Sequence, residues 1–197
     1  MRDTTTADAN AEQDKARRFR DAALPYLDDV FALARYLLRD AADAEDAVQE
    51  CYLRALRHFD SYRGPAMKPW LLAILRNVCN AEFARRGSGD TSADYADDKP
   101  GAEELPMWQE APASPEAVLL RRQDDAAIRR LVAALPLAFR EVIVLREVNE
   151  LSYQEIAAVA GVPVGTVMSR LARARSMLRS AWNAEGVAPE TASGGMS

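Results

Sequence analysis

Apolar residues recur every three or four positions along most of this chain, which is the spacing that places side chains on one face of an α-helix. No stretch shows the strict alternation of apolar and polar residues that is typical of a half-buried β-strand. The pattern therefore predicts an all-α fold. The stretches with helical spacing cover residues 25–39, 43–59, 70–86, 118–135, 137–148, 156–160 and 164–182.

Local signals predict where the helices of the first half begin and end. Pro25 suits the first turn of the helix that it opens. Asp43 is the expected N-cap of the next helix, because a carboxylate satisfies free N–H groups there and opposes the positive end of the helix dipole. Residues 60–69 contain Gly64 and two prolines, so we expect a loop of about ten residues. The third helix ends at Gly87.

In the second half, Pro136 separates two helices, since proline breaks a helix interior but suits a first turn. Ser152 and Glu155 form the pattern of a capping box and predict a helix start. Gly161 and Pro163 end that short helix, and a final helix follows after a three-residue turn. This helix, turn and helix have the form of a helix-turn-helix unit.

The helical stretches fall into two groups. Four prolines, three glycines and no sustained periodicity lie between them. The predicted organisation is a disordered tail (1–14), a first helical domain (15–86), a flexible acidic linker (87–117), a second helical domain with the helix-turn-helix (118–183) and a disordered tail (184–197).

Composition excludes several classes of protein. The chain has 197 residues, too few for a large enzyme fold, and no apolar run long enough for a membrane helix. Its beginning lacks the apolar stretch of a secretory signal, so we expect it to act in the cytoplasm without inserting into a membrane. A single histidine, two separated cysteines and no glycine-rich phosphate loop predict no catalytic residues, no metal site and no cofactor. Cys51 and Cys79 fall on apolar helix positions, where buried thiols are expected.

The net charge of −5 argues at first against a nucleic-acid partner, but the charge is unevenly distributed. Residues 87–118 hold eight acids and one lysine, which is −7, so the remaining chain is +2. Residues 163–182 carry four arginines and no acid. The acidity therefore belongs mainly to the linker, and the last helix is basic.

Helical geometry predicts which side of the last helix faces outward. Val167, Leu171, Ala174 and Leu178 fall on one narrow stripe and form its core face. Small and hydroxyl side chains together with arginines allow close approach to a DNA groove and contacts with phosphates or base edges. The alternative is a solvated face on which arginine is simply a good helix former. The outward side contains Thr166, Ser169, Ala172, Arg173 and Ser176, with Arg170 and Arg179 on its flanks.

At this point the sequence resembles a known family. Residues 151–175, LSYQEIAAVAGVPVGTVMSRLARAR, are similar to the promoter-reading segment of bacterial sigma factors of the extracytoplasmic-function (ECF) group. Residues 43–55, DAEDAVQECYLRA, followed by FDSYRG at 59–64 and WLLAILRN at 70–77, resemble the core-polymerase-binding and −10 segments of the same group. The two matches occur in the order of the family.

The resemblance implies a dissociable initiation subunit of RNA polymerase that directs transcription of a stimulus-specific gene set, as in a stress response. The first domain would dock on the clamp helices of the largest catalytic subunit, and the second domain on the flap of the other large subunit. The second domain would bind the −35 promoter element through Thr166, Ser169, Arg170, Ala172 and Arg173. The core-polymerase-binding residues would be Asp46, Gln49, Glu50, Leu53 and Arg54.

The resemblance also implies that the first domain melts the −10 element and captures a flipped base in a pocket, since a stacked base does not expose all its edges. Trp70 has an alternative role as a core anchor, and Arg85 and Arg86 would also complement the dipole at a helix end. The −10 residues would be Ser61, Tyr62, Arg63 and Gly64 in the loop, Trp70 and Asn77 on the next helix, and Arg85 and Arg86 at its end.

The resemblance also concerns a partner protein and the acidic linker. By resemblance, an anti-sigma factor holds the chain inactive, and the acidic linker runs toward a basic channel of the polymerase. Met168 and Ala172 depart from residues common in the family, so the promoter sequence is not transferable from relatives. The competing interpretation is a helix-turn-helix transcription regulator that acts without joining the polymerase, which would explain the second domain but not residues 43–77.

Overall fold

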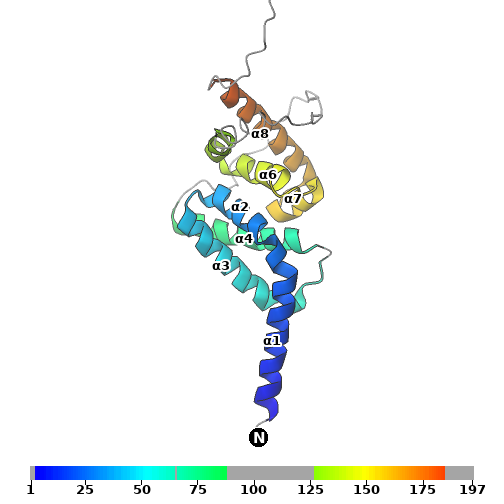
Figure 1. Ribbon diagram of the computed structural model, residues 1–197. Helices are drawn as coiled ribbons and strands as arrows, with labels where there is room; N and C mark the ends of the chain where they lie inside the picture. The colour runs from blue at the N-terminus through cyan, green and yellow to red at the C-terminus, as the bar shows by residue number, and fades with distance from the viewer. Residues whose placement is uncertain (1–2, 65, 88–126, 185–197) are drawn as a thin grey trace, which may run out of the picture.

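The structure is a computed structural model that describes residues 3–64, 66–87 and 127–184, with side chains from residue 12 onward (Figure 1). These residues form helices and short connections and contain no strand. The fold is all-α, as the apolar periodicity predicts. The helices of the first half are α1 (Asp3–Ala23), η1 (Leu24–Tyr26), α2 (Leu27–Leu38), α3 (Ala41–His58), η2 (Phe59–Ser61) and α4 (Met67–Arg85). Those of the second half are a helix over 127–134, α6 (Leu137–Glu147), α7 (Tyr153–Ala160) and α8 (Val164–Ala184).

The first domain is a bundle in which α2, α3 and α4 pack on one another. Its centre is filled by fully buried leucines, including Leu33 on α2 and Leu71, Leu72 and Leu75 on α4. Removing such side chains from water is the main favourable contribution to folding. Helix α1 leaves this bundle and projects away from it toward the N-terminus (Figure 1).

Helix α1 begins at Asp3, where the sequence analysis expects a disordered tail over residues 1–14. Residues 3–14 include three alanines, Glu12 and Gln13, which are good helix formers, and Arg17 pairs with Asp14 one turn away at 2.5 Å. Their polar composition conceals this tendency, because an exposed helix needs no apolar stripe along its whole length. The predicted linker over 87–117 and the tail beyond Ala184 lie outside the described residues, apart from Gly87.

Two predicted boundaries differ in the first domain. The N-cap of α3 is Asp40 and not Asp43: Asp40 has extended backbone, and its carboxylate accepts a hydrogen bond from the Asp43 N–H at 3.0 Å. The predicted ten-residue loop is shorter, since α4 begins at Met67 and includes Pro69. Proline is tolerated there because the N–H groups of a first helical turn have no partner within the helix.

The second domain follows its predicted local signals closely. Ser152 and Glu155 form a capping box at the start of α7. Gly161 ends that helix in the left-handed conformation, with φ of 66°, which glycine adopts without a steric penalty. No single helix in the described ranges has the length and apolar character of a membrane span, and only α7 and α8 taken together, bent by 100°, meet that test by length and composition.

The two domains pack directly against each other, α7 on α4 and α6 on α2 (Figure 1). Polar side chains of the second domain reach into the first. Arg140 donates to the Tyr36 carbonyl at 3.0 Å, and Asn149 donates to the Asp29 carbonyl at 2.9 Å. Both side chains are buried, so these bonds form away from water. The contact between the domains therefore combines an apolar core with specific hydrogen bonds.

Replacing Asn149 by alanine will lower the free energy of unfolding by about 0.5–1.5 kcal/mol, because the hydrogen bond from its buried amide to the Asp29 carbonyl is lost. Urea titration followed by circular dichroism measures this loss. The matched control is Asn77→Ala, which removes an exposed amide and will change stability by less than about 0.5 kcal/mol. Equal unfolding midpoints for the two variants would contradict the prediction.

Candidate nucleic-acid interface

Helix α8 buries most of its predicted core stripe, but it exposes its predicted DNA-facing residues to different degrees. Val167, Leu171 and Ala174 are buried against the second domain, as their spacing predicts. Ala172 is exposed, and the side chains of Thr166, Ser169 and Arg173 are half-buried. The Ser169 hydroxyl donates a hydrogen bond to the Thr166 carbonyl at 3.0 Å. Small side chains at the centre of this face leave the helix backbone close to the surface.

Arg170 differs from the other predicted −35 residues. It is only 9% exposed and lies on the inner side of α8. Its neighbours in helical projection are Val167 and Ala174, which face the core. Among the described residues, one terminal nitrogen of its guanidinium is buried without a hydrogen-bond partner. The structure therefore separates Arg170 from the exposed face of α8.

The positive charge of Arg170 interacts with the buried carboxylate of Glu141, which also links the two domains. Glu141 on α6 is almost completely buried, and it accepts a hydrogen bond from the Arg76 side chain on α4. Burial raises the pKa of Glu141, and the positive charges of Arg76 and Arg170 oppose that rise. Arg76 also approaches the turn of the helix-turn-helix unit, because its terminal nitrogen lies 3.9 Å from where a side chain at Gly161 would begin.

The predicted −10 loop is compact and packs on Trp70. The rings of Tyr62 and Trp70 are 4.5 Å apart between centroids and are tilted by 34°. Arg63 donates to the carbonyls of Asp60 and Tyr62 at 2.6 and 2.8 Å. A Cβ at Gly64 would lie 2.6 Å from the Tyr62 ring, so only glycine fits beside it. The sequence places these residues near one another, and the structure brings Tyr62, Gly64 and Trp70 into one cluster.

Trp70 and Asn77 lie two helical turns apart on the same side of α4. Trp70 is half-buried under Tyr62, which agrees with its alternative role as an anchor for the loop, while Asn77 is exposed. The two residues thus continue one face of α4 away from the loop. A single strand of nucleic acid passing the loop would run along this face.

Arg85 and Arg86 are both paired with carboxylates in this structure. Arg86 donates two hydrogen bonds to Asp43 at 2.7 and 2.6 Å and one to Glu82 at 2.5 Å, while Arg85 binds Glu82 at 2.6 Å. These pairs lower the pKa of Glu82 to about 2 and also lower the pKa of Asp43. Arg86 therefore ties the start of α3 to the end of α4. Because α3 begins at Ala41, Asp43 lies inside its first turn, where its N–H is capped by Asp40 and its carboxylate binds Arg86.

The predicted polymerase-binding residues line the outer side of α3. Asp46, Gln49 and Leu53 are exposed, with Leu53 at 47%, and Arg54 pairs with Glu50 at 2.6 Å. These five residues share a surface because their spacings are three and four.

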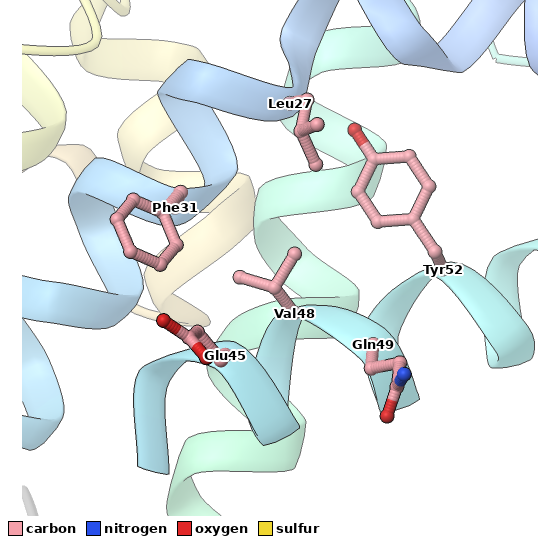
Figure 2. Close-up of a pocket in the computed structure, with 6 residues that line it drawn as sticks. All are labelled: Leu27, Phe31, Glu45, Val48, Gln49 and Tyr52. Atoms are coloured by element: carbon pink, nitrogen blue, oxygen red, sulfur yellow. The ribbon is translucent and has the colours of Figure 1, made fainter. Parts of the chain in front are cut away.

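Next to them α2 and α3 enclose an open hollow of about 290 Å³ (Figure 2). The sequence analysis missed Leu27 and Phe31, which extend the surface from α2. Both residues belong to the apolar spacing of the helix predicted over 25–39, and the sequence carries no signal that they stay partly exposed. The hollow is lined by Leu27, Phe31, Glu45, Val48, Gln49 and Tyr52.

The possible metal ligands and the two cysteines among the described residues form no reactive site. No group of three or more histidine, cysteine or acidic side chains among them is arranged to hold a metal ion. Cys51 and Cys79 are buried, as their apolar positions predict, and burial raises the pKa of each thiol to about 12. A thiol with such a pKa is a poor nucleophile at neutral pH.

Comparison with known proteins agrees with both halves of this description. Residues 23–88 match Sigma-70 region 2, and residues 125–178 match Sigma-70 region 4. The chain is 33% identical over 170 residues to the RNA polymerase sigma-H factor of Pseudomonas aeruginosa, covering 84% of this chain and 86% of that protein. It is 35% identical over 148 residues to the ECF RNA polymerase sigma-E factor of Escherichia coli K12, covering 74% and 76%.

A solved structure shows the same fold. The sigma factor RpoE of Bartonella quintana, in complex with the anti-sigma factor NepR, superposes with a TM-score of 0.64 at 27% identity and covers 85% of this chain and 98% of that one. The helical fold, the helix-turn-helix unit and both matched regions define a promoter-recognising subunit of RNA polymerase and not an enzyme. The chain belongs to the RNA polymerase sigma factors of the ECF group.

This membership decides between the two interpretations of the sequence. A regulator that acts without the polymerase would need only the second domain, whereas region 2 covers the first domain as well. The protein is a sigma factor that binds RNA polymerase and recognises promoters.

The arginine cluster at the end of α4 predicts a dependence of stability on pH. Glu82 has a pKa of about 2 in the folded chain against an ordinary value of 4.5. Its stabilising effect is therefore complete above about pH 4.5 and is lost as the pH falls toward 2. In Arg86→Gln, we expect a smaller loss of stability on acidification. Urea midpoints measured between about pH 5 and pH 3 test this, with the exposed Arg57→Gln as control. Parallel curves for Arg86→Gln and the unchanged chain would contradict it.

Proposed function

We propose that this ECF sigma factor binds the −35 element with the outward face of α8 and the −10 element with the loop at residues 61–64 and the adjoining face of α4. It would act in the cytoplasm on a stimulus-specific set of genes. The observation that best supports this assignment is the division of α8 into a buried stripe and an opposite face of small, hydroxyl and arginine residues next to the Gly161 turn. A recognition helix in a major groove requires this arrangement.

On α8, the exposed Ala172 permits close approach to the groove, and the half-buried Ser169 and Arg173 flank it. Arginine makes two parallel hydrogen bonds to guanine, which is the commonest specific contact in the major groove. We therefore assign base recognition to Arg173. Thr166 and Ser169 would position α8 in the groove. Arg170 is assigned no base contact, because its guanidinium points to the inner side of the helix.

In the −10 region, Tyr62 and Trp70 supply the aromatic surface that a flipped base needs. Stacking of one base on an aromatic side chain contributes ~1–3 kcal/mol, which is comparable with the free energy of removing it from the duplex. Gly64 leaves the Tyr62 ring the space to lie beside the backbone. The proposed pocket is therefore small and held in place by the contacts of the loop itself.

The outer side of α3 supports the assignment of polymerase binding. The hollow between α2 and α3 presents apolar surface bordered by the polar residues Glu45 and Gln49 (Figure 2), and Leu53 is exposed further along α3. Apolar patches rimmed by polar residues mark protein interaction sites. We propose that a polymerase helix packs here, with an apolar side chain in the hollow.

An anti-sigma factor is a further proposed partner. The superposed RpoE of Bartonella quintana is in complex with the anti-sigma factor NepR. This chain has the same fold over most of its length, so we infer that it too is held inactive by an anti-sigma factor.

The closed packing of the two domains is incompatible with simultaneous contact to both promoter elements. Elements at −35 and −10 are about 25 base pairs apart, which is roughly 85 Å of duplex at 3.4 Å per base pair. Helices α4 and α7, which belong to the two proposed DNA-binding domains, are in direct contact here. The 39 residues between Gly87 and Ala127 would reach roughly 130 Å if extended, which is long enough. We propose that the domains separate when the protein joins the polymerase and DNA.

A reconstituted transcription assay with core RNA polymerase and a promoter library tests the assignment on α8. The unchanged chain will select a −35 and a −10 sequence. Arg173→Ala will relax the preference at one −35 position by about 1–3 kcal/mol of discrimination. Arg179→Ala, an exposed residue of the same helix, serves as control and will leave the selected sequence unchanged. An equal loss on all promoters would show that Arg173 contacts phosphate and not a base.

The separation of the domains is tested by Arg76→Ala. This change leaves the Glu141 carboxylate buried without its main partner, a loss of about 3–5 kcal/mol if the closed packing persists. Separation of the domains returns Glu141 to water, so we expect a larger radius of gyration by X-ray scattering and tighter binding to core polymerase. The exposed Arg85→Ala is the control. An unchanged radius of gyration together with unchanged polymerase affinity would refute the role of this ion pair.

A further inference from the structure

Helix α1 has no assigned role, because most of it precedes the segment that matches Sigma-70 region 2 and none of it belongs to region 4. It projects from the body of the molecule, yet its last turns lie against the end of α3 (Figure 1). That end leads directly into the proposed −10 loop. The described side chains of α1, from residue 12 onward, therefore include neighbours of the promoter-melting site.

An aromatic contact joins α1 to the base of the loop. Phe19 is only 7% exposed, and its ring meets Phe59 edge-on at 5.4 Å and Tyr52 at 6.0 Å between centroids. The Tyr52 hydroxyl in turn donates to the Ala23 carbonyl at the end of α1, at 3.0 Å. Edge-to-face aromatic pairs stabilise a contact beyond the effect of the area they bury, and they favour a specific relative orientation of the rings. The position of Phe59, two residues before the loop, is thus set partly by α1.

A charged contact reaches one residue further. Lys15 lies 3.1 Å from one carboxylate oxygen of Asp60, and Arg18 lies 3.6 Å from the other. The Lys15 side chain is only 16% exposed, so this ammonium group is held against the protein. The Asp60 carbonyl accepts a hydrogen bond from Arg63 of the loop at 2.6 Å. Asp60 therefore connects α1 through its side chain with the loop through its backbone.

We propose that Lys15 and Phe19 are positioning residues for the −10 loop, so that α1 is part of the module that recognises the melted promoter. The proposal rests on the assignment of residues 61–64 to −10 recognition. Base capture is a balance of a few kcal/mol between unstacking and new contacts, so a loop held in place before the base arrives discriminates better than one that must be ordered on binding. Lys15 and Phe19 act through Asp60 and Phe59 and do not themselves touch the base.

The other ion pairs of α1 provide a matched control. Arg17 pairs with Asp14, and both residues are exposed members of α1 alone. The same change of charge at Arg17 therefore alters the helix without altering its contact with the loop. Comparison of Lys15→Glu with Arg17→Glu separates an effect on loop position from a general effect of charge near DNA.

The experiment uses the full chain with core RNA polymerase on a promoter with a pre-melted −10 region, in its selected and in a substituted −10 sequence. A fluorescent adenine analogue in the −10 strand reports binding of the polymerase complex to each promoter. Discrimination is the ratio of the binding constants for the selected and the substituted −10 sequence. We expect Lys15→Glu and Asp60→Lys each to lower discrimination about threefold to fivefold, the upper range for a single surface ion pair. The double variant, which restores opposite charges, will recover to within about twofold, and Arg17→Glu will have no effect.

Tyr62→Ala distinguishes this proposal from the one on which it rests. If Tyr62→Ala lowers discrimination but Lys15→Glu does not, the loop recognises the −10 element without help from α1, and the proposal is wrong. If Tyr62→Ala has no effect, the assignment of the loop itself fails. A double variant that is no better than either single variant would also overturn the proposal. Equal affinity of all variants for core polymerase verifies that each is folded.

Discussion

One buried carboxylate constrains how the two domains of this sigma factor meet, in addition to their shared apolar core. Glu141 lies inside α6, where water does not solvate it, and a buried charge without a partner is strongly unfavourable. Its hydrogen-bonded partner is Arg76, which belongs to the other domain. As long as the carboxylate stays buried, α4 must lie against the second domain and bring Arg76 to it. The packing of α7 on α4 and the inward direction of Arg170 are both consistent with this requirement.

Helices α4 and α8 consequently use different faces for the contact between the domains and for the proposed promoter contacts. Helix α4 presents Trp70 and Asn77 on one face and Arg76 on another, so the helix beneath the proposed −10 loop also contacts the second domain. Helix α8 carries its small exposed residues outward and Arg170 inward. In the proposed function, promoter binding and domain closure would therefore use the same helices with different side chains.

Local signals in the sequence predicted most of the fold. The apolar stripe of α8, the capping box of Ser152 and the glycine stop at Gly161 depend on residues within a few positions of one another. The errors had both local and long-range causes. Asp43 resembles an N-cap, but Arg86, 43 positions away, engages its carboxylate while Asp40 caps the helix. Arg170 resembles a flanking DNA contact, but the second domain buries it. The helix over residues 3–14 was missed because its composition is polar and it needs no core.

The sequence alone determined the family, the all-α fold and the residue types available for promoter recognition, because these follow from helical periodicity and from motifs of adjacent residues. Only the tertiary structure decided which of those residues are accessible. It placed Tyr62 on Trp70, set the hollow between α2 and α3 beside Leu53, and joined Lys15 to Asp60. The reason is physical: accessibility and ion pairing depend on distances between segments that are far apart along the chain, and a one-dimensional pattern carries no such distances.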